Sequence, residues 1–288
     1  MEKNSSYAKG IFYILLSAFG FSVMSLSVNL AGDLPVFEKA MFRNAFAMLF
    51  SLLLFLKSGD KLNLERENVK LLIVRSALGT IGIYANFYAI DHLMLSDASM
   101  LNKLSPFFTL LLSAVILKEE TSWKQYLFII IAFIGMLFII KPSLEFTDNM
   151  LASLIGVLGG FAAGAAYTAV RALGKRGVPS TEIIFVFSAF STVIGIPLVI
   201  MDHAPMSIKQ VMIMIVASLG ATLGQVGITA AYKEAPSKKI SIFDYFNVIF
   251  SALWGFLFLG QVPDAFSFIG YLIIFMSAYL MFLYNRKH

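Results

Sequence analysis

Ten apolar stretches, each long enough to cross a lipid bilayer as a helix, dominate this sequence of 288 residues. The hydrocarbon core of a bilayer is about 30 Å thick and an α-helix rises about 1.5 Å per residue, so one crossing takes roughly 20 residues. We predict spans at residues 8–30, 35–56, 70–91, 94–117, 123–140, 150–172, 181–200, 209–231, 239–260 and 265–284. The connectors between them are short. The sequence therefore predicts an all-α polytopic membrane protein of ten transmembrane helices, without a soluble domain.

The composition excludes several other classes of protein. Hydrophobic residues make up 59% of the chain and charged residues 14%, whereas about a quarter of the residues in a soluble domain are charged. Because the chain has no cysteine, disulfides, thiolate metal sites and cysteine nucleophiles are excluded. None of the three histidines falls in a predicted span, and nothing resembles a Walker loop. We therefore expect no metal, no cofactor, no catalytic residue and no ATP hydrolysis.

Basic residues are concentrated on one side of the predicted membrane. If the N-terminus is cytoplasmic, 17 of the 22 Lys and Arg residues fall in cytoplasmic loops or helix ends, the exceptions being Lys39, Arg43, Lys103, Lys141 and Lys209. Cytoplasmic loops of membrane proteins carry such an excess. We predict a multi-pass protein of the plasma membrane with both termini in the cytoplasm. The formal net charge of +5 then reflects topology, and we expect no nucleic-acid partner.

The second half of the chain repeats features of the first half at a nearly constant offset. Pro35-x-x-Glu38 corresponds to Pro179-x-x-Glu182 at an offset of 144 residues, and residues 117–119 correspond to residues 259–261 at an offset of 142. Five spans per half is an odd number, so the second copy would enter the membrane from the opposite side. The sequence predicts a five-plus-five inverted repeat, with residues 1–145 and 146–288 as two repeats within one compact membrane domain. Such repeats place a solute site near the bilayer midplane and permit alternating access.

Three segments carry a resemblance to a known family. They are RSALGTIGIYANFYAIDHL from Arg75, SDASMLNKLSPFFTLLLSAVILKEE from Ser96 and KISIFDYFNVIFSALWGFLFLGQ from Lys239. Together with the duplication, they resemble the EamA family of the drug/metabolite transporter superfamily. The resemblance implies a central cavity between spans 1–4 and 6–9, with spans 5 and 10 at the periphery, where they support the bundle or a dimer contact. The sequence departs from the family pattern at Gln261, where a Glu often ends the ninth span, and at Asn247, near a usual Pro.

Two charged residues occupy near-equivalent places in the two halves: Lys103 in the fourth span and Asp244 in the ninth. Each lies about 10 Å below the membrane surface by helical rise. A charge at that depth is costly and normally faces a cavity or a partner. Separated in depth by about 10 Å in an inverted repeat, the two would bind the carboxylate and the amine of a zwitterionic solute. The alternative is a direct Lys103–Asp244 salt bridge that only neutralises two buried charges.

Further polar residues within the spans are candidate solute ligands, namely Tyr84, Asn86, Gln225, Ser241 and Asn247. Ser241 and Asn247 lie three residues to either side of Asp244, and this helical spacing puts a polar stripe on one face of the ninth span. The others would supply an aromatic wall and amide groups for a solute with a flat or apolar portion. The alternatives are hydrogen bonds and aromatic packing between neighbouring helices.

Three charged residues open the second span. Glu38 and Lys39 are shallow enough for their side chains to extend to the membrane surface, whereas Arg43 lies about 12 Å inside by helical rise. Arg43 either holds a solute carboxylate or pairs with Glu38 or Asp244. Arg75, near the cytoplasmic end of the third span, is interpreted instead as an anchor that fixes the topology, with a solute ligand as the alternative.

These observations predict a secondary transporter, a permease or an exporter, that moves a small amphipathic and zwitterionic metabolite by alternating access. An amino acid and an amino-acid-containing nucleoside are examples. The expected partners are this small-molecule substrate and the lipid bilayer, with a coupling proton or counter-substrate and a homodimer as further candidates. The alternatives are a lipid-modifying enzyme within the membrane and a receptor that transports nothing. The enzyme would need a paired nucleophile and base or a metal cluster, and because the sequence shows neither, we predict that the protein is not an enzyme.

Overall fold

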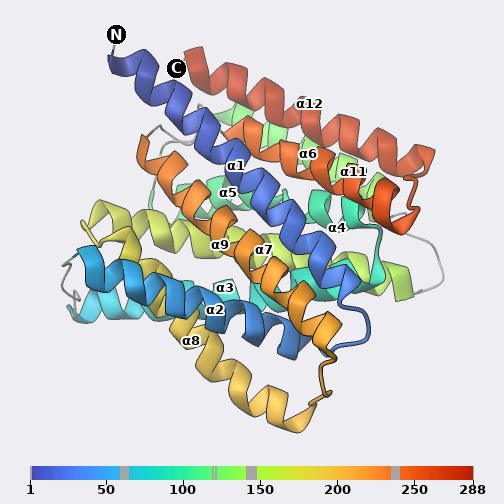
Figure 1. Ribbon diagram of the computed structural model, residues 1–288. Coiled ribbons are helices and arrows are strands. Elements are labelled where there is room, and N and C mark those ends of the chain that lie inside the picture. The colour runs from blue at the N-terminus through green and yellow to red at the C-terminus, as the bar shows by residue number, and fades with distance from the viewer. Residues whose placement is uncertain are drawn as a thin grey trace.

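The computed structural model describes residues 2–58, 65–118, 120, 122–140, 148–234 and 241–287, and within these ranges the chain is helical without a strand. In chain order the helices are α1 (Glu2–Leu30), α2 (Val36–Ser58), α3 (Arg66–His92), α4 (Leu95–Asn102), α5 (Ser105–Ile116), α6 (Trp123–Ile140), α7 (Asp148–Lys175), α8 (Ser180–Met201), α9 (Ile208–Glu234), the 3₁₀ helix η1 (Ser241–Tyr245), α11 (Phe246–Leu259) and α12 (Ala265–Lys287). They form one bundle in which both ends of the chain lie on the same side (Figure 1).

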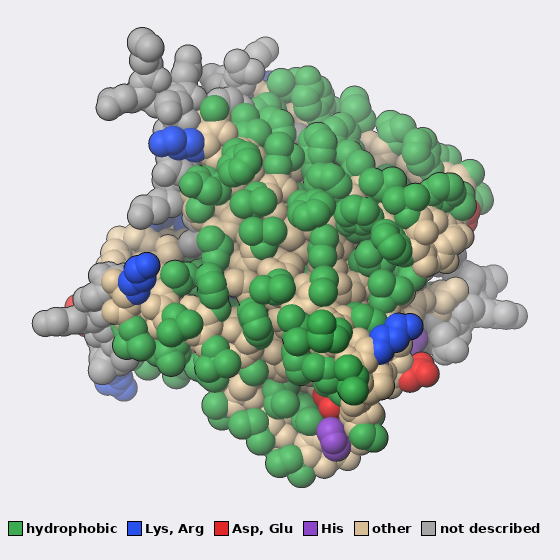
Figure 2. Space-filling model, viewed as in Figure 1, with side chains coloured by type: hydrophobic (Ala, Val, Ile, Leu, Met, Phe, Trp, Pro, Cys, Tyr) green, Lys and Arg blue, Asp and Glu red, His purple; other side chains and the backbone are tan. Residues whose placement is uncertain are grey.

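The helical segments correspond to the ten predicted membrane spans, the fourth span being made of α4 and α5 and the ninth of η1 and α11. Within the described ranges, nine segments are long and apolar enough to cross a membrane, and Phe243–Leu259 is a shorter apolar helix at the ninth predicted span. Large apolar side chains are exposed on the outside of the bundle, while many Ser, Thr and charged side chains are buried between the helices. Figure 2 shows a face covered mainly by hydrophobic side chains, with charged side chains near its edges. The predicted class, an all-α multi-pass membrane protein, is confirmed.

Contacts between helices recur in pairs: where two helices pack together, the two equivalent helices of the opposite halves also pack together. Helix α1 packs against α9 as α7 packs against α3, α5 against α7 as α11 against α1, and α3 against α8 as α9 against α2. Of the remaining major pairs, α2 with α8 and α6 with α12 join equivalent helices, α4 packs against α7 as η1 packs against α1, and α4 with α11 joins the fourth span to the ninth. In Figure 1, α6 and α12 lie at one side of the bundle, and α2 and α8 lie at the opposite side. This pattern is what a two-fold relation between five-helix halves requires.

Turn conformations also recur at equivalent places. Gly32 after α1 and Gly177 after α7 both have left-handed backbones, with φ of 66° and 75°. Lys118 after α5 and Gly260 after α11, which are 142 positions apart, have φ of 53° and 63°. Glycine adopts this conformation without steric cost, whereas a residue with a Cβ atom adopts it at a cost of about 1–2 kcal/mol. The backbone path has therefore been retained at Lys118 although the residue type that suits it has not.

The fourth and ninth spans, expected to be continuous helices, are both interrupted. Helix α4 ends at Asn102 and α5 begins at Ser105, with Pro106 in the first turn of α5. Proline lacks an N–H and its ring collides with the carbonyl four residues earlier, here that of Asn102, so Pro106 favours a break or a kink at this place. In the ninth span the 3₁₀ helix η1 passes into α11 at Tyr245. The break at Lys103 and the break at Tyr245 are 142 residues apart and face each other across the repeat.

Small residues allow α7 to approach the break in the fourth span. A Cβ atom added to Gly160 would lie 2.8 Å from the carbonyl oxygen of Leu101, and one added to Gly164 would lie 2.8 Å from that of Ser105. The hydroxyl of Thr109 donates to the carbonyl of Gly164 at 3.1 Å. Close approach of this kind is how small residues join helices in membranes. Helix α7 therefore holds the two half-helices of the fourth span, and the residue between them, in place.

Candidate functional site

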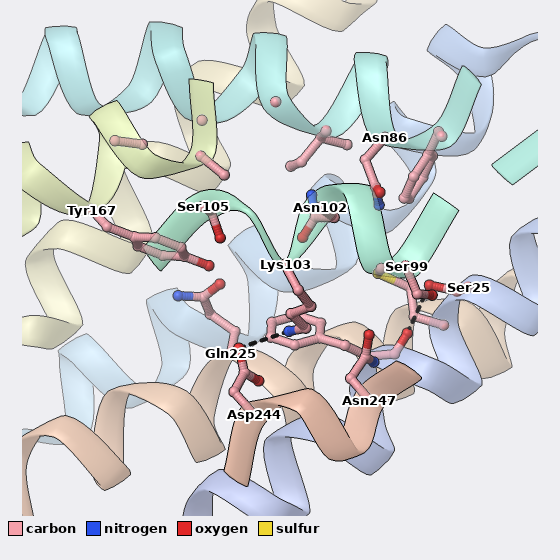
Figure 3. Close-up of a pocket in the computed structure, with 18 of the residues that line it drawn as sticks. Ser25, Asn86, Ser99, Asn102, Lys103, Ser105, Tyr167, Gln225, Asp244 and Asn247 are labelled. Carbon is pink, nitrogen blue, oxygen red and sulfur yellow. Dashed lines mark hydrogen bonds and ion pairs between the residues drawn. The ribbon is translucent and has the colours of Figure 1, made fainter. Parts of the chain in front are cut away.

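A central cavity lies between the two halves. The side chains that line it come from spans 1–4 and 6–9, and none of the lining residues belongs to α6 or α12. Six of the eight residues predicted as solute ligands line it, namely Arg43, Asn86, Lys103, Gln225, Asp244 and Asn247. Figure 3 shows Lys103 and Asp244 between a group around Tyr167, Ser105 and Gln225 and a second group around Asn86, Ser99 and Asn247.

Lys103 and Asp244 form a direct ion pair. Lys103 Nζ donates to Asp244 Oδ2 at 2.7 Å, and each side chain is 7% exposed. The expected separation of about 10 Å is therefore wrong for the state that the structure shows, because both side chains reach across the gap between the broken spans. The second carboxylate oxygen, Oδ1, is buried without a hydrogen-bond partner within the described part of the chain. The pair thus neutralises two charges and leaves one acceptor unused.

Side chains near the two breaks form hydrogen bonds with the opposite half of the chain. The hydroxyl of Tyr245, at the ninth-span break, donates to the carbonyl of Lys103 at 3.0 Å. Asn247, in the first turn of α11, donates through Nδ2 to the carbonyl of Ala18 at 3.0 Å. The hydroxyl of Ser99 donates to that of Ser251 at 2.8 Å. These contacts fix the relative positions of α1, α4 and α11 around the ion pair, since a buried polar group without a partner is costly.

One predicted ligand, Tyr84, lies away from the cavity, and the side chain of another, Ser241, falls outside the described part of the structure. The ring of Tyr84 packs edge-on against Phe37 with 5.0 Å between ring centroids, and its hydroxyl is buried without a hydrogen-bond partner among the described residues. Tyr84 and Asn86 are two positions apart, about 200° around a helix, so they cannot face the same cavity, and Asn86 is the one that does. Ser241 is the first residue of η1, and its side chain lies outside the described part of the structure.

The charged residues at the start of α2 differ from expectation. Lys39 is fully buried, and its ammonium forms a salt bridge with Asp91 at 2.7 Å. It does not extend to the membrane surface, because that partner lies within the bundle on α3. Glu38 is also buried and accepts a hydrogen bond from the backbone N–H of Ala204 at 3.1 Å. Arg43 pairs with neither Glu38 nor Asp244, and its Nη1 donates to the side-chain oxygen of Asn44 at 2.7 Å.

Arg75 was interpreted as a topology anchor, but it is a cavity residue. It is 4% exposed and lines the cavity together with Tyr167 and Phe187, which the sequence did not single out. The cavity-facing positions of α3 are 75, 79, 82, 83, 86 and 87, which is the spacing of one helix face. Because Arg75 lies eleven residues before Asn86, just over three full turns, the helical period of that face was the signal that could have identified it.

A helical bundle of two similar halves around a polar cavity with a buried ion pair defines a membrane transport protein. The chain belongs to the EamA-like transporter family, whose sequence pattern matches residues 8–141 and again residues 150–283. Each half thus carries one copy of the family pattern.

Individual relatives agree with this assignment. The chain is 33% identical over 270 residues to the pseudopaline exporter CntI of Pseudomonas aeruginosa, across 93% of this chain and 94% of that protein. It is 29% identical to human solute carrier family 35 member G1, across 93% and 77%. It is 23% identical to the S-adenosylmethionine uptake transporter of Rickettsia bellii, across 98% and 96%. The protein is therefore a transporter of a small molecule and not an enzyme.

The fold also matches a known crystal structure. The match has a TM-score of 0.71 at 14% sequence identity, and it covers 98% of this chain and 99% of the other. At this identity the similarity concerns the arrangement of helices alone.

Proposed function

We propose that this protein is a secondary transporter whose solute carries both an amino and a carboxylate group and binds at Lys103 and Asp244. The observation that supports this most directly is the buried Lys103–Asp244 pair on the cavity wall, with Oδ1 of Asp244 unpaired. When a zwitterion enters, its carboxylate replaces Asp244 as the partner of Lys103, and its amine replaces Lys103 as the partner of Asp244. One protein–protein ion pair is thereby exchanged for two ion pairs between protein and solute.

The rest of the cavity suits an amphipathic solute. Phe21, Met24, Ile83 and Phe87 contribute apolar surface, while the side-chain amides of Asn86, Asn102 and Gln225 contribute donors and acceptors. Solute sites of this kind combine apolar walls with a few polar groups that fix orientation. An amino acid or an amino-acid-containing nucleoside meets both requirements. Tyr84 and Ser241 are not part of the proposed ligand set, because the first packs elsewhere and the second lies outside the described side chains.

Movement through the membrane would proceed by alternating access. Residues 1–145 and 146–288 are proposed as two inverted repeats, since their helix contacts exchange in pairs, and the solute site lies at their interface. We place both termini on the cytoplasmic side of the plasma membrane, from the distribution of basic residues. A proton or a counter-substrate would couple transport, and α6 and α12, which line no part of the cavity, would form a homodimer contact. Since the relatives include an exporter and an uptake transporter, direction is not assigned.

Reconstitution tests the proposal. The purified chain is first screened for thermal stabilisation by zwitterionic metabolites, because a ligand at 100 times its dissociation constant stabilises the folded state by about 2.7 kcal/mol. Stabilising compounds are then assayed in liposomes that contain this chain alone. We expect uptake that follows the solute or proton gradient without ATP. Uptake that requires ATP or a second protein would contradict the proposal.

A further inference from the structure

Two cavity residues are cations without an acidic partner. Arg43 of α2 and Arg75 of α3 are each 4% exposed, and both line the cavity. Neither guanidinium takes part in a salt bridge within the described part of the chain, and the Nε atom of each is buried without a hydrogen-bond partner there. A buried charge normally has a counter-charge, because it has left the water that stabilised it. We therefore expect a bound anionic group to supply the counter-charge for these two arginines.

Neutral side chains hold Arg43 in position. Its Nη1 donates to Oδ1 of Asn44 at 2.7 Å, and Nδ2 of Asn44 in turn donates to the hydroxyl of Ser191 on α8 at 2.8 Å. Thr80 on α3 donates to the same hydroxyl at 2.8 Å. A guanidinium has five N–H donors, and this chain of contacts uses one of them. Arg43 is thus oriented by its neighbours but keeps its charge and most of its donors available.

A neutral environment also positions Arg75. Its guanidinium lies over the ring of Phe187, 3.8 Å from the centroid, in the geometry of a cation–π interaction. A Cβ atom at Gly79 would collide with Nη1 of Arg75, so this glycine gives the side chain room to lie along its own helix. The side chain of Tyr167 on α7 lines the same cavity. The two arginines and the tyrosine thus contribute polar groups to one cavity.

The cavity as a whole is positively charged. Its ionised lining residues are the cations Arg43, Arg75 and Lys103 and the anion Asp244, which gives a net charge of +2. A zwitterion bound at the Lys103–Asp244 pair does not alter this excess. Charges inside a low-dielectric site act strongly on one another. The cavity is therefore complementary to a solute that carries an additional negative charge near the two guanidinium groups.

We propose that Arg43 and Arg75 form a subsite for an oxyanion, a carboxylate or a phosphate, and that the transported solute is an acidic zwitterion with one such group beyond its amine and its first carboxylate. This rests on the proposed function of the Lys103–Asp244 pair. The planar guanidinium fork matches the two oxygens of either group. The Tyr167 hydroxyl would donate a further hydrogen bond to the same group.

The test compares matched probes at fixed ionic strength. Thermal shifts of the purified protein are measured with L-glutamate against L-glutamine, O-phospho-L-serine against L-serine, and γ-L-glutamyl-L-glutamate against γ-L-glutamyl-L-glutamine. We expect the acidic member of at least one pair to raise the Tm at least three times as much as its neutral member. The pair that responds distinguishes a carboxylate from a phosphate. Equal shifts within every pair, or no shift from any acidic member, would overturn the subsite.

Variants locate the effect. Arg43→Gln and Arg75→Gln should each abolish the preference for the acidic probe and should unfold, without ligand, at a Tm no lower than the parent, because each relieves repulsion between the two cations. Arg43→Lys should retain part of the preference. The exposed Lys209→Gln removes an equal charge far from the cavity and should change nothing. If Arg43→Gln fails to fold, a second measurement replaces it. Phenylglyoxal modifies arginine, and in the parent protein only the acidic probes should protect Arg43 from this modification.

The outcomes separate the two proposals. Suppose that Lys103→Met/Asp244→Asn abolishes the binding of zwitterions, whereas Arg43→Gln and Arg75→Gln do not change it. The proposed function then stands and the subsite is rejected. If the acidic preference survives in both arginine variants, the subsite is also rejected. If acidic probes bind in a manner that depends on the arginines but not on Lys103 and Asp244, the proposed function fails while the oxyanion site stands.

Discussion

Replacement of Lys103 or Asp244 singly should destabilise the protein, because each substitution leaves the other charge buried. In Lys103→Met, the Asp244 carboxylate loses the only donor to Oδ2 among the described residues, and Oδ1 already has none. In Asp244→Asn, the Lys103 ammonium loses its carboxylate. Both side chains are 7% exposed, so little water can take over either role. Breaking a buried pair by removing one member costs about 3–5 kcal/mol, and we expect each single variant to lose that much stability.

The double variant Lys103→Met/Asp244→Asn removes both charges together. Exchange of a buried ion pair for neutral residues of similar volume is often neutral or stabilising, so the double variant should be at least about 3 kcal/mol more stable than either single variant. It should nevertheless be inactive, because the solute has lost two charge-assisted contacts of about 1.5–3 kcal/mol each. That loss corresponds to roughly 10²- to 10⁴-fold weaker binding. Chemical denaturation and uptake into proteoliposomes measure the two quantities on the same preparations.

A matched control is the ion pair between Lys39, which is fully buried, and Asp91, whose side chain is 18% exposed. Lys39 and Asp91 form a salt bridge of equal length, 2.7 Å, but neither lines the cavity. Lys39→Met/Asp91→Asn should therefore recover stability and transport together. A Lys103→Met/Asp244→Asn protein that transports at the parental rate would refute the reasoning, since the pair would then be structural only. Equal inactivation by the control would show that loss of transport is not specific to the cavity.

Three further predictions concern topology, packing and the turns. Epitope tags at both termini should be accessible in spheroplasts only after permeabilisation of the membrane, and a C-terminal tag accessible from outside would contradict the assigned orientation. Gly164→Ala should destabilise by about 1–3 kcal/mol through overpacking, because its Cβ would lie 2.6 Å from that of Phe108; Gly174→Ala on the same helix, with nothing within 4 Å, should be neutral or stabilising by denaturation. Lys118→Gly should stabilise by up to about 1 kcal/mol, since φ at this position is 53°, whereas a lower stability would show that this backbone carries no strain.

Much of the fold follows from the sequence because a bilayer imposes a minimum length on each apolar segment. The breaks in the fourth and ninth spans were not predicted, since hydropathy is insensitive to them. For the fourth span a signal was present, as Pro106 favours a break or a kink in a helix. For the ninth span no proline is present, and the break at Tyr245 became visible only through its equivalence to Lys103 at an offset of 142 residues.

The candidate site was partly predictable, for a related reason. Buried ionisable residues such as Lys103 and Asp244 stand out in apolar segments, but the distance between them depends on side-chain direction and on helix breaks that hydropathy does not reveal. Tyr84 was chosen by residue type although it cannot share a helix face with Asn86. Arg75 was assigned by its proximity to a loop, a criterion that ignores the face on which it lies. The roles of the individual ligands remain predictions.

The pairing of α1 with α9 has a consequence for biosynthesis. Ser17 of α1 donates a hydrogen bond to the carbonyl of Gly224, which is 207 positions later in the chain, and Gly20 approaches the backbone of Gly220 so closely that a Cβ atom would lie 2.7 Å from its carbonyl oxygen. At about 5–20 residues per second, a ribosome needs roughly 10–40 s to add that length of chain. During this interval α1 resides in the membrane with its small-residue face against lipid or an insertion factor. The first half, synthesised alone, would keep that face uncovered indefinitely, so the first helix to enter the bilayer is among the last to reach its native neighbours.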